Sequence, residues 1–182
     1  MLRRTNAKQV VPVFLDVIRE YPTPTALANA KPHKIRRMLK QLGLAWRTEN
    51  VIDMGKMLVH KYRGRVPSNY EELRRLPGVG DYVASAVCSF AFDEPRAVID
   101  TNTVRVVGRY FGFPTHAESR RNNFVRDAIR AVTDVNNPRL FNQAFLDFGS
   151  IVCTAINPKC VSCPLRTNCI EGQKRLARRN HA

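Results

Sequence analysis

Apolar residues recur at intervals of three and four along most of the chain, which places them on one face of an α-helix. Strict apolar–polar alternation, the pattern of a half-buried strand, is scarce. Three amphipathic stripes stand out before residue 60. Their members are Val10, Val13, Phe14, Val17 and Ile18; then Ile35, Met38, Leu39 and Leu42, closed by Gly43 as a C-cap; then Val51, Ile52, Met54, Met57 and Leu58, after Trp46.

The second half of the chain continues the helical pattern. It predicts helices over residues 71–76, 82–92, 103–111, 120–135 and 138–152. Ser119 and Asn136 stand where N-caps are expected, and most of the prolines fall between the predicted helices. We therefore predict an all-α fold.

The bulk composition is that of a globular protein. The 182 residues suffice for one ordinary domain or two small ones, and 44% are hydrophobic and 25% charged. No apolar run reaches the roughly 20 residues that a membrane-spanning helix needs. The first residues, MLRRTNAKQV, lack the apolar core of a signal peptide. We expect a soluble, cytoplasmic, nucleoid-associated protein with no membrane partner.

The charge balance points to a polyanionic partner. Thirty Lys and Arg residues against fifteen Asp and Glu give a net charge of +15. Residues 31–65 hold ten cations and two acids, and the tail KRLARRNHA adds four more cations. Such an excess favours nucleic acid, because each neutralised phosphate releases condensed counterions. A basic surface that is merely solvated is the alternative.

Four of the five cysteines crowd the C-terminal region with the spacing C-x6-C-x2-C-x5-C: Cys153, Cys160, Cys163 and Cys169. Paired disulfides are a poor reading of a chain that looks intracellular. Four thiolates can enclose zinc or a [4Fe–4S] cluster, and ligand chemistry alone leaves both open. Cys88 lies in an apolar helical run and reads as a buried small hydrophobe.

The stretch LPGVGDY, residues 76–82, carries a second candidate site. Gly78 and Gly80 around Val79 allow a tight turn and a close approach to a neighbour. A helix begins directly afterwards, and its first N–H groups favour an anion such as phosphate. For so short a motif, the alternative is an ordinary helix–turn–helix corner with no binding role.

Taken together, these features resemble the helix-hairpin-helix (HhH-GPD) DNA glycosylases, the superfamily of endonuclease III and the MutY adenine glycosylases. The shared segments are LPGVGDY, VIDTNTVRV, NQAFLDFGSIVC and the four cysteines, in the family's order and spacing. The resemblance implies a [4Fe–4S] cluster rather than zinc, held by the four cysteines. It also implies two lobes with double-stranded DNA in the cleft between them. Residues 1–94 would form a helical barrel lobe, with the hairpin motif at about 70–92, and residues 95–182 the cluster lobe. A monomer is the family expectation.

The same resemblance assigns the chemistry. Asp100 in VIDTN becomes the carboxylate that stabilises an oxocarbenium-like sugar as the base departs, although an N-cap role is its alternative. Asn102 completes the D-x-N pattern of MutY-like members and orients the aspartate. Tyr82 occupies the position of the lysine that forms a Schiff base in lyase-competent relatives. A phenol cannot do this, so we expect a monofunctional glycosylase. Asp81 departs from the basic or neutral residue common there and is expected to weaken the phosphate grip somewhat.

The choice of base depends on the N-terminal residues MLRRT. MutY-like sequences carry a glutamine wedge and an upstream glutamate that protonates adenine, whereas the paired arginines resemble thymine/uracil mismatch glycosylases. Arg4 would be the wedge, with Arg3 and Leu2 beside it on DNA. By the family pattern we expect the glutamate to lie just upstream of Met1, and the family's N-terminal helix to be missing from this sequence as well. Lack of that acid fits excision of a pyrimidine that leaves as an anion. A truncated start and impaired activity are the other readings.

We therefore expect excision of thymine or uracil opposite guanine in mismatched duplex DNA. The alternatives are adenine excision from A·G or A·8-oxoguanine pairs, and a catalytically impaired protein that binds damaged DNA.

Overall fold

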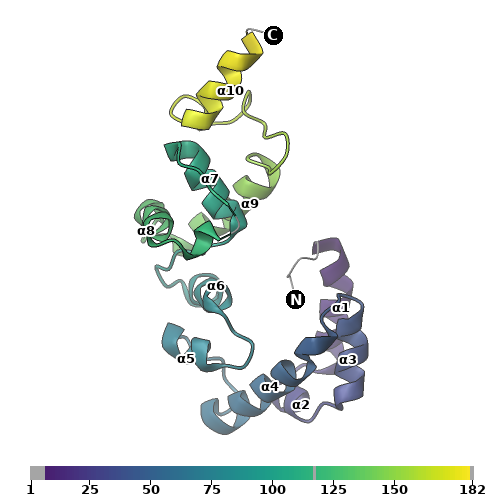
Figure 1. Ribbon diagram of the computed structural model, residues 1–182. Coiled ribbons are helices and arrows are strands. Elements are labelled where there is room, and N and C mark those ends of the chain that lie inside the picture. Colours follow the sequence, from purple (N-terminus) through teal and green to yellow (C-terminus); the bar gives the residue numbers. More distant parts are fainter. Residues whose placement is uncertain (1–6, 117, 181–182) are drawn as a thin grey trace. The chain divides into compact units, whose positions relative to one another are not determined.

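The structure is a computed structural model that describes residues 7–116 and 118–180 (Figure 1). All regular structure in these ranges is helical, so the all-α prediction is confirmed for them. The first half contains α1 (Ala7–Glu20), α2 (Pro24–Ala28), α3 (Pro32–Lys40), η1 (Ala45–Arg47), α4 (Thr48–Tyr62) and α5 (Tyr70–Arg75). The second half contains α6 (Asp81–Phe92), α7 (Thr101–Phe111), η2 (Ser119–Arg121), α8 (Asn123–Val132), α9 (Pro138–Ile151) and α10 (Ile170–Asn180). None of the helices described is long and apolar enough to cross a bilayer.

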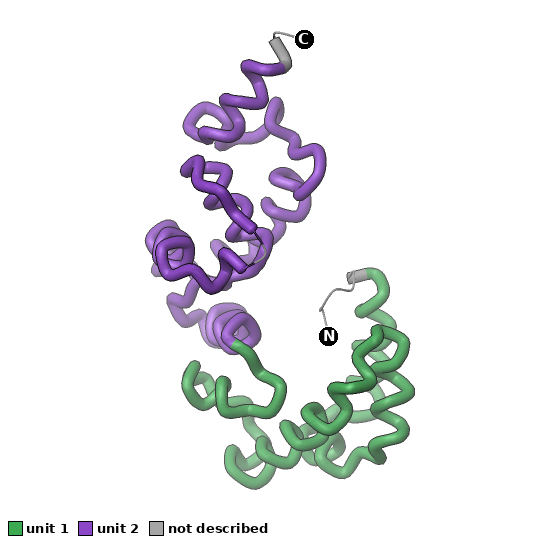
Figure 2. The backbone as a smooth tube through the Cα atoms, in the orientation of Figure 1, with its two compact units in different colours: residues 1–80 green, residues 81–182 purple. Residues whose placement is uncertain are grey.

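The chain divides into two compact units, residues 1–80 and 81–182 (Figure 2). The division falls between Gly80 and Asp81, at the junction of the LPGVG stretch and the helix that follows it. The lobes expected over 1–94 and 95–182 stay a prediction, as does the cleft between them.

The first unit is built around the three predicted stripes. Val10, Val13 and Val17 of α1 are buried together with Ile35 and Leu39 of α3, as an amphipathic pair of helices requires. At Gly55 of α4 the backbone of α2 comes very close, since an added Cβ would lie 2.8 Å from the Ala28 nitrogen. Glycine therefore allows α2 to lie directly against α4.

In the second unit α7 packs against α8, α9 and α10. Its buried valines, Val104 and Val107, join Val125 and Ile129 of α8 in a small core. A fully buried amide, Asn142 of α9, also ties this unit together. Its Oδ1 accepts from Val98 N at 3.0 Å, and its Nδ2 donates to Ser89 Oγ and to the Arg96 and Pro138 carbonyls at 2.8–3.0 Å.

The predicted caps are displaced. Ser119 is buried in η2, where its hydroxyl accepts from His116 N, and Asn122 caps α8 instead. Asn137, not Asn136, precedes α9. The helices α2 and α10 were not expected from the sequence. Gly43 lies beyond the end of α3 with φ +68°, in the left-handed region that suits a glycine after a helix.

Candidate active site and cysteine pocket

The LPGVG stretch forms a tight turn in the first unit. Val79 N donates to Leu76 O at 3.1 Å, and Gly78 adopts φ +75°. Both turn carbonyls are held by arginines: Arg47 Nη2 donates to Gly78 O at 2.7 Å, and Arg74 Nη1 donates to Val79 O at 3.0 Å. Gly78 and Gly80 themselves remain exposed to solvent. The turn is therefore a fixed loop whose exposed face is backbone.

Asp81, at the start of α6 in the second unit, is ion-paired. Its Oδ2 accepts from Arg126 Nη1 of α8 at 2.8 Å, and both side chains are partly buried. The sequence predicts that Asp81 weakens a phosphate site somewhat, because its negative charge opposes phosphate. Arg126 neutralises that charge, so the repulsion expected from the sequence is reduced.

Asp100 is the N-cap of α7, as its alternative interpretation held. Its Oδ1 accepts from the backbone N–H groups of Asn102 and Thr103 at 2.7 and 2.9 Å. The Thr103 hydroxyl accepts in return from Asp100 N at 2.9 Å, which completes a capping box. The half-buried carboxylate is thus held in one orientation by the helix it begins.

Asn102 binds the other oxygen of the same carboxylate. Its Nδ2 donates to Asp100 Oδ2 at 3.0 Å, while its own Oδ1 accepts from Arg105 Nη2 at 2.8 Å. Arg105 also donates to Gly149 O at 2.6 Å and, through Nε, to Cys153 O at 2.9 Å. The end of α9 therefore fixes Arg105, which fixes Asn102, which fixes the carboxylate.

Tyr82 lies within electrostatic reach of this carboxylate, in the same unit. Burial raises the pKa of its phenol, and the negative charge of Asp100 raises that pKa further. The side chain is 40% exposed, so part of the ring faces solvent. Tyr82 and Asp100 thus share a local environment, and the phenol keeps its proton at neutral pH.

All four clustered cysteines line one pocket of the second unit, together with apolar side chains that include Val106 and Phe148. Burial raises the pKa of the Cys160 thiol; Arg175 opposes the rise, and the other three cysteines add to it. Among the residues that the structure describes, no three His, Cys, Asp or Glu side chains converge as a single metal ion requires. The predicted metal site is therefore supported by a shared pocket but is not itself demonstrated.

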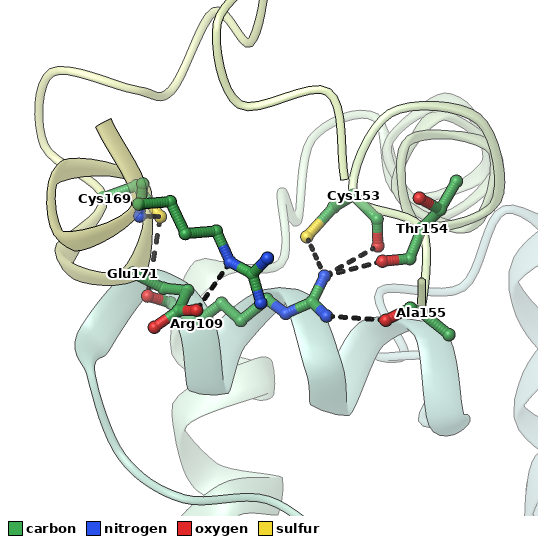
Figure 3. A network of polar contacts seen from close by, with 8 residues as sticks. Arg109, Cys153, Thr154, Ala155, Cys169 and Glu171 are labelled. Carbon is green, nitrogen blue, oxygen red and sulfur yellow. Dashed lines mark hydrogen bonds and ion pairs between the residues drawn. The ribbon is translucent and has the colours of Figure 1, made fainter. Parts of the chain in front are cut away.

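One wall of this region is held by Arg109 of α7 (Figure 3). Its Nη1 donates to Thr154 O at 2.7 Å and approaches Cys153 Sγ at 3.4 Å, and its Nη2 donates to Ala155 O at 3.0 Å. On the opposite side, Gly172 N donates to Cys169 Sγ at 3.3 Å. Two of the four thiols thus already accept N–H groups of the protein.

The sequence matches a family of DNA repair proteins. The family model described as "HhH-GPD superfamily base excision DNA repair protein" matches residues 1–130, well over half of the chain. The chain belongs to this superfamily. The resemblance drawn from the sequence is confirmed.

Several HhH-GPD relatives are similar along most of the chain. The thymine/uracil-DNA glycosylase of Pyrobaculum aerophilum is 37% identical over 96% of this chain and 78% of its own length. The thymine-DNA glycosylase of Aeropyrum pernix is 35% identical over 93% and 78%. An adenine DNA glycosylase of Buchnera aphidicola is 31% identical over 93% of this chain, which spans 48% of that relative.

Two solved structures agree with this chain in fold. A thermostable thymine-DNA glycosylase superposes with a TM-score of 0.85 at 30% identity, over 95% of this chain and 80% of the other. An endonuclease III trapped as a covalent intermediate with DNA gives a TM-score of 0.82 at 29% identity, over 96% and 81%. This chain therefore has the fold of a base excision DNA glycosylase.

Of the predicted site residues, Asn102 is hydrogen-bonded to Asp100, and Tyr82 lies in the same unit within electrostatic reach of that carboxylate; their catalytic roles stay a prediction. Arg105 and Arg109 were not predicted, although their four-residue spacing on one face of α7 was a signal that could have found them. Arg4, the predicted wedge, and Leu2 and Arg3, predicted to contact DNA beside it, lie outside the described residues.

Proposed function

We propose that this chain is a monofunctional DNA glycosylase that removes thymine or uracil mismatched with guanine. One observation carries the proposal: the Asp100 carboxylate is held on both oxygens, by two backbone N–H groups on Oδ1 and by the Asn102 amide on Oδ2. A fixed negative charge beside the atom where positive charge develops lowers the activation barrier, because no protein group has to reorient during the reaction.

The chemistry follows from that carboxylate. The mismatched nucleotide leaves the stack, the bond between C1′ and the base nitrogen breaks, and the base departs with the electron pair. The sugar becomes positively charged at C1′, where Asp100 stabilises it until water adds. The proton that the water loses goes to the departed base anion, and the abasic sugar forms. Tyr82 contributes a neutral phenol beside the sugar. Because a phenol cannot form a Schiff base, no strand cleavage by lyase chemistry is expected.

Similarity to relatives favours the pyrimidine. The thymine and thymine/uracil glycosylases match at 35–37% identity over 78% of their own lengths, whereas the Buchnera adenine glycosylase matches at 31% over 48% of its own. Adenine excision remains the second candidate, because its relatives match nearly the whole of this chain.

We propose that the cysteine pocket holds a [4Fe–4S] cluster, with Cys153, Cys160, Cys163 and Cys169 as its ligands. All four line one pocket, and Arg109 and Gly172 N present donors to two of the sulfurs. A cluster extends over several atoms, so its thiolates can stand further apart than those around one ion. When bound, it would supply four metal–thiolate bonds that tie the loop after α9 to α10. We further propose two lobes around mismatched duplex DNA, a monomeric state and a cytoplasmic, nucleoid-associated location.

The test is a single-turnover reaction with four end-labelled duplexes carrying G·T, G·U, A·G or A·8-oxoguanine, followed by hot alkali. We expect breaks at the thymine or uracil, only after alkali. Asp100→Asn should lower the excision rate by about 10²–10³-fold, the effect of removing one fixed electrostatic contact, and leave the Kd for DNA within about twofold. Breaks at adenine would replace the substrate proposed, and breaks without alkali would refute the monofunctional reading. Tight binding with no cleavage of any duplex would identify a binder.

A further inference from the structure

The hairpin turn is fastened by two arginines that come from different elements of the first unit. Arg47 ends η1 and Arg74 lies in the last turn of α5. Their bonds reach successive carbonyls, 2.7 Å to Gly78 O and 3.0 Å to Val79 O. Carbonyl oxygens carry partial negative charge and repel an approaching phosphate. A guanidinium bound to each of two such oxygens therefore makes the electrostatic potential at the turn positive, which attracts a phosphate.

The turn and Arg47 are seated together. A Cβ added at Gly78 would lie 3.2 Å from Asn50 Cβ and 3.4 Å from Arg47 Nη2, so the turn lies directly against the start of α4. The Arg47 guanidinium also sits over the Trp46 ring at 5.3 Å, a cation–π contact that limits its freedom. Arg47 is thus positioned before any ligand arrives.

Both arginines keep binding capacity. A guanidinium has five N–H donors, and each of these two uses a single nitrogen in its bond to the turn. Arg74 is exposed, as are Gly78 and Gly80 beside it. One guanidinium can therefore hold a turn carbonyl and, with its remaining donors, bind a phosphate oxygen on the exposed side.

We propose that Arg47 and Arg74 form a two-arginine clamp that fixes the hairpin turn and itself binds the DNA backbone, one phosphate contact each. The clamp rests on the proposed function only in taking DNA as the ligand of the hairpin. It supplies positive charge at the turn, and it acts on affinity rather than on bond cleavage.

The experiment measures the Kd of a duplex with a stable abasic-site analogue between 50 and 400 mM NaCl. The proteins are wild type, Arg47→Ala, Arg74→Ala, the double variant, Arg47→Lys and Arg47→Gln. Arg19→Ala is the matched control, because Arg19 is an exposed arginine of the same unit, paired with Asp16 on α1. The single-turnover excision rate at saturating protein is recorded for each variant. Circular dichroism and thermal unfolding check that each variant folds.

Each alanine variant should raise Kd about five- to tenfold at 0.1 M salt and reduce the slope of log K against log salt by about 0.9. The double variant should reduce this slope by about 1.8. In all three alanine variants the single-turnover excision rate at saturating protein should stay within twofold of wild type. Arg47→Lys, which keeps the charge, should restore the slope. Arg47→Gln, which keeps only a donor for Gly78 O, should not.

Wild-type slopes in both alanine variants, or a wild-type slope in Arg47→Gln, would overturn the clamp. A loss in Arg19→Ala as large as that in Arg47→Ala would also overturn it, since the effect would then be general charge. Failure of the proposed function looks different: the wild type would cleave none of the four duplexes, while the binding slopes would still decide the clamp.

Discussion

Gly149 of α9 offers a sharp test of how the carboxylate is held. A Cβ built at this position would lie 2.7 Å from Asn102 Cβ and 3.4 Å from Asn102 Cα. The Gly149 carbonyl is also the acceptor for Arg105 Nη2 at 2.6 Å. Gly149→Ala therefore pushes on the residue that orients Asp100, without removing any polar group.

The displacement can be estimated from the contact. Moving the added Cβ from 2.7 Å to the 3.4 Å at which ordinary contact begins requires about 0.7 Å between α9 and the first turn of α7. Overpacking of a helix contact costs about 1–3 kcal/mol of stability. A misplacement near 1 Å of a group that positions the reaction costs about 10²-fold in rate. We expect the single-turnover excision rate to fall about 30- to 100-fold, with the Kd for DNA unchanged.

The assay is single-turnover excision at saturating protein, with thermal unfolding measured in parallel. Gly43→Ala is the matched control. Gly43 has φ +68° and no atom within 4 Å of an added Cβ, so its substitution costs about 1 kcal/mol of backbone strain far from the carboxylate in sequence. It should lower stability and leave the rate intact. If Gly149→Ala excised at the wild-type rate, the positioning of Asp100 through Asn102 would be refuted.

Three further predictions concern the second unit. Cys163→Ser should abolish the brown absorbance and the bound iron and sulfide, about four of each per chain. Cys88→Ala should retain them, because Cys88 is buried in α6. Equal loss in both variants would contradict the assignment of the cluster cysteines. Asn142→Leu should lower the free energy of unfolding by about 3–5 kcal/mol in denaturant titrations, since the Val98 N–H and neighbouring groups lose their buried partner; a change under 1 kcal/mol would argue against that role. Because partial burial raises the folded-state pKa of Tyr82, wild-type stability should fall as pH rises above about 10, and the stability of Tyr82→Phe should fall less. Equal losses of stability between about pH 9 and 11 would count against the raised pKa of this phenol.

The helices with strong apolar periodicity were predictable. The bounds of α6, α7 and α9 lie within two residues of the sequence expectation, because local spacing and tertiary burial agree there. The C-terminal helix α10 was missed for a physical reason. Its sequence, IEGQKRLARRN, is dominated by charge and reads as a solvated tail. What anchors it is Ile170, which packs so closely on Gly112 that an added Cβ there would lie 2.9 Å from its Cδ1.

Some residues of the candidate site were likewise predictable from the sequence, and others were not. Asp100 and Asn102 are adjacent in sequence to the helix they begin, so a local motif identifies them. Arg105 and Gly149 cannot be paired from the sequence, because their bond joins positions 44 residues apart. Arg126 and Asp81 are separated by 45 residues, so the neutralisation of Asp81 was equally hidden.

The bonds from Arg109 bear on how the protein matures. One guanidinium donates to the carbonyls of Thr154 and Ala155 and approaches Cys153 Sγ (Figure 3). The conformation of the backbone after α9 is therefore fixed by contacts within the polypeptide. A cofactor delivered to this pocket would meet its first thiol already in place. Insertion of the proposed cluster would then follow folding of the polypeptide as a separate step.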